Sequence, residues 1–246
     1  MGIVTGAKFH LYKEKILSLQ LPLSDHDLLN STFLLEKDVQ KKLEVYYTPF
    51  DYINEYAKMV IAGITPGLHQ MKKAYTTVIE NRHLSDEELL HQVKKSASFE
   101  GSMRNNLISM LDELELPRYL GISSSSQLFG EASHLVYTTS ILPYAVFYNH
   151  QNFNGSRPNI LKTDILLAYV NKYFMKDISK IENPLIIPLG VNVSKVLTYF
   201  YNEIPILRGF PHPSGSNGHR HRQFRENKED MSRQIENYFT DHSLGV

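Results

Sequence analysis

The sequence predicts an α/β fold: a three-layer α/β/α arrangement with a central, mostly parallel, four-stranded sheet and an N-terminal helical extension. Short apolar runs alternate with stretches of helical periodicity, which is typical of a parallel sheet with helices on both faces. Apolar residues make up 42% of the 246 positions, enough for one large core. Two of the apolar runs end in loops of small residues, as strands do at the ligand-binding edge of α/β sheets.

Residues 1–54 are expected to form the helical extension, packed on a main domain of residues 55–246. Apolar residues recur there among polar ones, as on an amphipathic helix. They include Leu28, Leu29, Phe33, Leu34 and Leu35. A strand is expected near 58–64 and a helix over 68–81. Ser85 and Glu88 then form a capping box that starts a helix running to about residue 96.

The rest of the chain continues this alternation. Helices are expected over 101–115, 160–174, 191–202 and 223–240, strands over 135–139, 184–189 and 204–207, and loops over 123–126 and 144–159. The loop at 123–126 is a run of serines and is expected to be flexible.

The composition excludes several classes of protein. The chain has no cysteine, so disulfides, thiolate zinc sites and iron–sulfur clusters are excluded. No apolar run reaches the length of a membrane span, and the N-terminus lacks a signal pattern. We therefore expect a cytoplasmic protein that needs no membrane, metal or other cofactor.

The net charge is zero, which is not typical of a protein that coats nucleic acid. The charges are nevertheless unevenly spread. Residues 204–225 contain four arginines, three histidines and no acid. This stretch predicts a local phosphate-binding surface, although an ordinary surface loop balanced by Glu226, Glu229 and Asp230 is the alternative.

The first loop is Gly63-Ile64-Thr65-Pro66-Gly67, directly after an apolar run. Its glycines allow close backbone approach and its proline stiffens the turn. The loop is therefore suited to holding a side chain and a water molecule in one geometry, with Thr65 at its centre. A plain strand-to-helix turn has the same residue types and is the alternative.

The second loop is His212-Pro213-Ser214-Gly215-Ser216-Asn217-Gly218-His219-Arg220. Small residues expose backbone N–H groups to phosphate oxygens, and Arg220 and Arg222 add positive charge. A neutral His212 can donate a hydrogen bond to an oxygen on which negative charge develops. Asn217 and Gly218 are expected at a projecting tip. A glycine-rich surface loop is the alternative.

Metal binding by His212, His219 and His221 is a different functional interpretation. It is disfavoured because no carboxylate lies in this stretch.

Phe99 precedes a predicted helix within Ser98-Phe99-Glu100-Gly101. An aromatic side chain there can stack on a flipped base while the helix N-terminus faces a phosphate. Core packing is the alternative, and it is the usual place for a phenylalanine.

These motifs together resemble the uracil-DNA glycosylase superfamily over about residues 55–240. Gly63–Gly67 is similar to the family's first motif, and His212–Gly215 to its second. The resemblance implies a base pocket that includes Gly63, Ile64, Phe99 and Ser140. It implies catalytic roles for His212 and Thr65. DNA contacts are implied for the loop residues Ser214, Gly215, Ser216, Asn217, His219, Arg220 and Arg222.

The chain departs from this family at two positions. Uracil-removing members commonly carry Asp, Asn or Glu where this chain has Thr65, and Asn where it has Ser140. A smaller side chain at Ser140 leaves room for a bulkier base and removes the amide that selects uracil. We therefore expect a glycosylase for a modified or damaged base, such as a hypermodified pyrimidine of phage DNA.

The expected reaction hydrolyses the N-glycosidic bond of an extruded base in DNA. His212 stabilises the leaving base, and a water positioned near Thr65 attacks the sugar. A threonine hydroxyl has little basicity, so Glu100 and His69 are alternative bases. Two rival functions are a uracil or mismatch glycosylase in repair, and a catalytically inactive DNA-binding module of the same fold.

Overall fold

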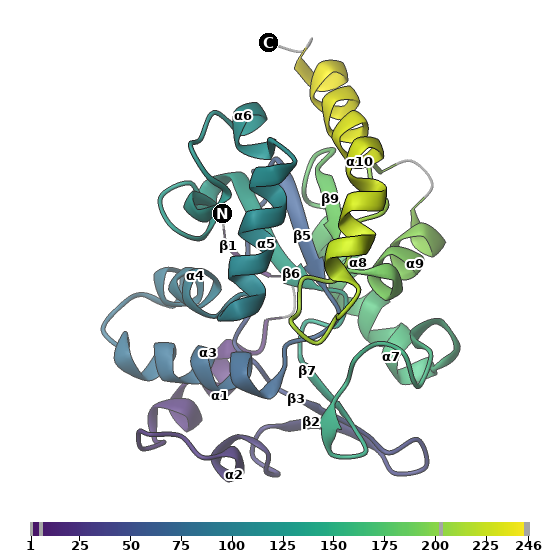
Figure 1. Ribbon diagram of the computed structural model, residues 1–246. Coiled ribbons are helices and arrows are strands. Elements are labelled where there is room, and N and C mark those ends of the chain that lie inside the picture. Colours follow the sequence, from purple (N-terminus) through teal and green to yellow (C-terminus); the bar gives the residue numbers. More distant parts are fainter. Residues whose placement is uncertain (1, 5–6, 202–203, 244–246) are drawn as a thin grey trace. The chain divides into compact units, whose positions relative to one another are not determined.

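The computed structural model describes residues 2–4, 7–201 and 204–243 (Figure 1). Contacts within the chain divide the described residues into two compact units, each built from three segments. Unit 1 comprises Met1–Glu55, Ile64–Ser98 and Thr139–Ile181, and unit 2 comprises Tyr56–Gly63, Phe99–Thr138 and Glu182–Val246.

Unit 2 holds a parallel sheet. Its central strand β5 (Met59–Gly63) lies between β6 (Val136–Ser140) and β9 (Leu185–Pro188), as Figure 1 shows. Strands β5 and β9 are parallel, with Met59 opposite Leu185. Beyond β9, Ile206 forms a single parallel bridge with Ile186. Every residue of β5 and β9 is buried, as expected for strands covered on both faces.

Helices flank this sheet. They are α5 (Ser102–Glu113), α6 (Leu116–Leu120), α9 (Val191–Phe200) and α10 (Arg220–Ser243), with 3-10 turns at Ser125–Phe129 and Ser133–Leu135. Leu107 and Leu111 of α5 share one apolar core with Met231 and Ile235 of α10 and with strand residues such as Ile61. This core fixes the ends of the strands, from which the candidate loops emerge.

Unit 1 contains an antiparallel sheet in the order β2-β3-β7-β8 and a short pair, β1 with β4. The strands are β1 (Gly2–Ile3), β2 (Leu34–Asp38), β3 (Leu43–Tyr46), β4 (Tyr52–Ile53), β7 (Ala145–Tyr148) and β8 (Gln151–Asn152). The helices are α1 (Phe9–Leu17), α2 (Asp25–Leu28), α3 (Leu68–Glu80), α4 (Asp86–Ala97), α7 (Asp164–Tyr169) and α8 (Met175–Ile178), with a 3-10 turn at Ile160–Lys162 and a π-helical turn at Val170–Phe174.

Aromatic rings fill the interior of unit 1. Tyr12 stacks on Tyr47 with ring centroids 4.2 Å apart, and Phe33 meets Tyr75 edge to face at 5.0 Å. Tyr144 meets Tyr173 in the same edge-to-face manner. Such pairs suit the quadrupoles of the rings and add to the burial of apolar area.

The α/β class and the flanked parallel sheet are confirmed, although the predicted fourth strand is reduced to the bridge at Ile206. The prediction of a helical N-terminal segment is wrong for most of residues 1–54, which contain four strands besides α1 and α2. All four residues of strand β3 are buried, and the strand pairs with β2 on one side and β7 on the other. Residues 1–55 share unit 1 with two later segments, and the domain boundary at residue 54 remains a prediction.

Two predicted loops also contain regular structure. The stretch 144–159 contains β7 and β8, joined by a turn in which Asn149 and His150 adopt positive φ angles of 51° and 60°. The serine run at 123–126 leads into a 3-10 helix, because the hydroxyl of Ser124 caps it by accepting the N–H of Ser126. The helix predicted over 160–174 corresponds to a 3-10 turn at Ile160–Lys162 and a continuous helical run from Asp164 to Ile178, whose middle part, Val170–Phe174, is π-helical.

No helix in the described part of the chain is both long and apolar enough to span a membrane.

Candidate active site

The His212 loop of unit 2 lies beside the exit of strand β9. Gly190, two residues after β9, has a φ of 92° and donates its N–H to the carbonyl of Phe210 at 3.2 Å. A β-carbon on Gly190 would lie 2.9 Å from the β-carbon of His212. Two chain segments that follow neighbouring positions of the parallel sheet therefore meet at His212, which is where α/β folds place their ligands.

The backbone of this loop is held by side-chain amides and a guanidinium. Asn217 donates Nδ2–H to the carbonyl of His212 at 3.1 Å, and Arg220 donates Nη1–H to the carbonyl of Ser214 at 2.9 Å. Asn106 of α5 donates Nδ2–H to the carbonyl of Pro213 at 2.9 Å. Asn217 and Arg220, predicted to contact DNA, thus also fasten the loop.

The two ring nitrogens of His212 have different hydrogen-bonding roles. Its Nδ1 accepts the backbone N–H of Ser214 at 3.2 Å, so Nδ1 carries no proton in this arrangement. Burial lowers the pKa of His212 below 6.5, which favours the neutral ring near pH 7. A neutral ring with an unprotonated Nδ1 carries its proton on Nε2, and Nε2–H is then a hydrogen-bond donor.

Thr65 belongs to unit 1 and is tied to the start of β7. Its hydroxyl donates to the carbonyl of Tyr144 at 2.8 Å and accepts the N–H of Val146 at 3.0 Å. The hydroxyl thus makes the two hydrogen bonds, one donated and one accepted, that the backbone of a neighbouring strand would otherwise make with this segment. It keeps one lone pair, and its proton is already engaged.

Ile64 is partly buried and packs against a later loop in unit 1. Its carbonyl accepts the N–H of Leu142 at 2.9 Å, and a β-carbon on Gly155 would lie 2.9 Å from the Cδ1 of Ile64. Ser140, at the end of β6, is buried. Gly63 is the last residue of β5.

Phe99 is part of the unit 2 core, with 5% of its surface exposed. Its φ of 55° is rare for a large side chain, and Gly101 two residues later has a φ of 88°. Such strained turns are frequent at functional sites, so the position fits both core packing and a pocket wall.

The other basic residues of the loop are exposed. His219 projects to solvent, and Arg222 lies in an ion pair with Glu226 at 3.8 Å on α10. The hydroxyls of Ser214 and Ser216 are hydrogen-bonded to each other at 2.8 Å, and Gly215 is exposed. This part of the loop presents small polar groups and cationic side chains to solvent.

The structure brings His212, Ser214, Asn217 and Arg220 together in one hydrogen-bonded loop of unit 2, whereas Thr65, Ile64 and Ser140 belong to unit 1. Sequence reasoning missed Asn106 and the role of Gly190. Gly190 follows a predicted strand, which was a usable signal, whereas no local pattern marks Asn106, which lies 107 positions before Pro213. The alternative bases Glu100 and His69 lie just before α5 and on α3, respectively.

Among residues 2–4, 7–201 and 204–243, no three His, Cys, Asp or Glu side chains are grouped as a metal ion requires. Metal binding by His212, His219 and His221 therefore has no geometric support.

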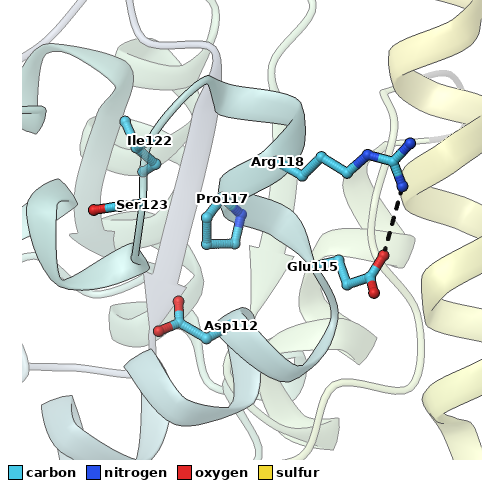
Figure 2. A pocket seen from close by; sticks show the side chains of 6 residues that line it. All are labelled: Asp112, Glu115, Pro117, Arg118, Ile122 and Ser123. Atoms are coloured by element: carbon cyan, nitrogen blue, oxygen red, sulfur yellow. Dashed lines mark ion pairs between the residues drawn. The ribbon is translucent and has the colours of Figure 1, made fainter.

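A separate surface cavity of about 410 Å³ lies beside α5 and α6 in unit 2 (Figure 2). Its lining includes Asp112, Ser123 and an ion pair between Arg118 and Glu115 at 3.8 Å. The Asp112 carboxylate already accepts the Ser124 hydroxyl at 2.8 Å and the Ser125 N–H at 2.7 Å. Asp112 therefore has a structural role in this cavity, capping the 3-10 turn.

Comparison with known proteins relates the chain to a bacterial protein, although no family model matches the chain. It is 41% identical over 236 residues to the uncharacterized protein YoxB of Bacillus subtilis strain 168, covering 92% of this chain and 91% of YoxB. The chain therefore belongs to the same family as YoxB. The crystal structure of wild-type Pedobacter heparinus SMUG2 aligns with 95% of this chain and 97% of its own, at 14% identity and a TM-score of 0.43.

Proposed function

We propose that this protein is a DNA glycosylase that hydrolyses the N-glycosidic bond of a flipped, modified or damaged base. The observation that carries the proposal is which ring nitrogen of His212 accepts a hydrogen bond and which one donates. Its Nδ1 accepts the Ser214 N–H, and burial favours the neutral ring, so Nε2–H is the donor. A neutral, preorganised donor is suited to an oxygen on which charge develops during bond cleavage.

The reaction begins when the glycosidic bond breaks and its electron pair moves to the departing base. His212 donates a hydrogen bond to that base and stabilises its negative charge. A water molecule attacks the sugar carbon and loses a proton, and the base gains one. The products are a free base and an abasic site. Removal of one preorganised donor typically lowers such a rate by about 10²–10³-fold.

Thr65 contributes less to water activation than the motif alone implies. Its hydroxyl proton is directed at the Tyr144 carbonyl, so the oxygen can only accept from a water. We propose that Thr65 positions water or the loop, and that proton removal falls to another group or to solvent once the sugar cation has formed. Glu100 and His69 remain the candidate bases.

DNA binding is proposed for the exposed part of the His212 loop. Arg222 supplies positive charge, and His219 a polar ring, next to the small residues Gly215 and Ser216. Short polar side chains and backbone N–H groups suit phosphate oxygens, while the arginine adds a salt-dependent attraction. The loop's size also suits filling the gap left by an extruded base.

The substrate class that we infer is a pyrimidine with a bulky modification. Ser140 is small and buried at the end of β6, where a larger amide would occupy space and select uracil. Hypermodified pyrimidines of phage DNA fit this description, which would give the protein a role in antiphage defence. Damaged bases as substrates would instead indicate DNA repair.

The test is incubation with duplexes that carry uracil, a damaged base or glucosylated hydroxymethylcytosine, with abasic sites scored by alkaline cleavage. We expect product from the modified base and a loss of about 10²-fold or more for His212→Ala. His83→Ala, an exposed histidine of unit 1, is the matched control.

Product from uracil alone would favour the uracil or mismatch glycosylase. Salt-dependent duplex binding with no product from any substrate would overturn the enzyme and favour the inactive DNA-binding module. Wild-type rates for His212→Ala would refute the role of His212.

A further inference from the structure

Three successive carbonyl oxygens of the His212 loop each accept a side-chain donor. Asn217 binds the carbonyl of His212, Asn106 that of Pro213 and Arg220 that of Ser214, at 3.1, 2.9 and 2.9 Å. Asn217 is part of the loop, and Arg220 begins α10. Asn106 alone among the three comes from a distant element, helix α5.

Helix α5, which carries Asp112 and Asn106, is anchored in the hydrophobic core of unit 2. The neighbouring α5 residues Leu107, Met110 and Leu111 are buried in the unit 2 core. A donor carried by such a helix cannot follow the loop if the loop moves. The bond to Pro213 therefore fixes the position of the loop relative to the unit 2 core. A bond made within the loop fixes only the loop's internal conformation.

The pinned carbonyls define the backbone conformation at the histidine. The ring of Pro213 fixes its own φ angle near −65°. With the carbonyls of His212 and Pro213 both held, the rotations on either side of Pro213 are set as well. The Ser214 N–H is thereby aimed at Nδ1 of His212, at 3.2 Å, which selects the tautomer with the proton on Nε2.

We propose that Asn106 is a positioning residue for His212. Its amide anchors the Pro213 carbonyl to α5, and this bond keeps the Ser214 N–H on Nδ1 and the Nε2–H donor in place. The catalytic part of this inference rests on the proposed glycosylase function, whereas the structural part stands on the loop geometry alone.

The consequence for catalysis is a loss of rate with little loss of DNA affinity. Asn106 makes its bond to the protein's own backbone, so its removal leaves the phosphate-binding side chains present. Misplacement of a catalytic group by about 1 Å can lower a rate by about 10²-fold. We therefore expect a fall in the single-turnover rate of about ten- to a hundredfold for Asn106→Ala, at nearly unchanged dissociation constant.

The decisive experiment is a ¹⁵N spectrum of the His212 imidazole in the full chain, assigned with His212→Gln. Wild type should show one neutral tautomer, with the proton on Nε2. Asn106→Ala should give a mixture of tautomers. Asn106→Gln, which keeps an amide donor, should restore part of the wild-type signal. Asn105→Ala is the matched control, because Asn105 is the exposed neighbour on the same helix.

A second variant covers the case in which Asn106→Ala does not fold. Asn106→Asp has nearly the same shape but presents an acceptor to the Pro213 carbonyl, and Asn105→Asp is its charge-matched control. An unchanged His212 spectrum in the folded Asn106 variants would overturn the proposal. If wild type excises no base but the spectra change as expected, the glycosylase function fails and the positioning role of Asn106 stands.

Discussion

Gly190 and His212 are in such close contact that residue 190 has no room for a side chain. An added β-carbon would lie 2.9 Å from that of His212, and the φ of 92° at Gly190 is itself unfavourable for any other residue. The packing that brings the end of β9 to the catalytic candidate therefore depends on a glycine 22 positions away, as counted from 190 to 212.

Replacement of Gly190 by alanine is expected to destabilise unit 2. The backbone strain alone costs about 1–3 kcal/mol, and the contact with His212 adds to it. Urea denaturation of Gly190→Ala should therefore show a free energy of unfolding lower by about 3 kcal/mol. Gly218→Ala is the control, because nothing lies within 4 Å of an added β-carbon there, and equal stabilities of the two variants would contradict the packing described.

The pH dependence of the proposed activity follows from His212. Burial lowers its pKa below 6.5, so the ring stays neutral as the pH falls to that value. Protonation at lower pH would put a hydrogen on Nδ1, facing the Ser214 N–H, and would break that hydrogen bond. Single-turnover rates should be flat from about pH 6.5 to 8 and fall below it.

The control for this profile is His212→Gln, whose amide can donate but does not titrate. Its rate should be lower than that of wild type and show no acid limb attributable to residue 212. A wild-type rate that rises as the pH falls below 6 would be inconsistent with a neutral histidine donor.

Thr65 is expected to matter more for stability than for chemistry. Thr65→Val keeps the shape but leaves the Tyr144 carbonyl and the Val146 N–H without the hydroxyl, at a cost of about 1–3 kcal/mol. Thr65→Ser keeps both bonds and should be less affected. Thermal and urea denaturation measure the difference, and excision by Thr65→Val should exceed that by His212→Ala.

The buried Lys94 is expected to make stability depend on pH in the alkaline range. Only 7% of its surface is exposed, and burial lowers its pKa from 10.5 to about 7, although the charges of Asp177 and Asp51 oppose the shift. Between these two pKa values the unfolded chain binds more protons than the folded one. The free energy of unfolding should therefore rise from pH 7 towards pH 10, by at most about 1.4 kcal/mol per pH unit.

The neighbouring acidic groups act with the opposite sign to Lys94. Burial raises the pKa of Asp51, Tyr47 and Tyr144, so the folded chain holds their protons longer than the unfolded one and they make the free energy of unfolding fall, not rise, with increasing pH. Lys94→Met should abolish the alkaline rise. Lys95→Met, at the partly exposed next position, should retain it. A rise that survives in Lys94→Met would assign the effect to other groups.

Local signals in the sequence were sufficient for several elements. The capping box at Ser85 predicts the start of α4, and the structure shows both of its hydrogen bonds. The continuous apolar run before Gly63 predicts β5, because a strand covered on both faces needs no alternation. The His212 loop could be recognised from the sequence because its histidines, arginines and small residues all lie within one short stretch.

Other elements depend on partners far along the chain. Strand β7 lies in a stretch rich in Asn, Tyr and Phe, and it is a strand because β3, about 100 residues earlier, pairs with it. The left-handed turn at Asn149 and His150 has no glycine to signal it. Asn106 likewise has no local pattern, since its role is set by a carbonyl 107 positions later.

The hydroxyl of Tyr238, on the last helix, donates to a backbone carbonyl of Asn183 at 2.9 Å and lies 3.2 Å from that of Lys58. Strand β5 thus begins next to the side chain of a residue that lies 180 positions later in the sequence. Contacts of such sequence separation form late in folding, because a long stretch of chain must first be closed. On the ribosome, β5 would emerge long before its partners β9 and α10, and the part of its apolar surface that they cover would stay exposed until synthesis is nearly finished.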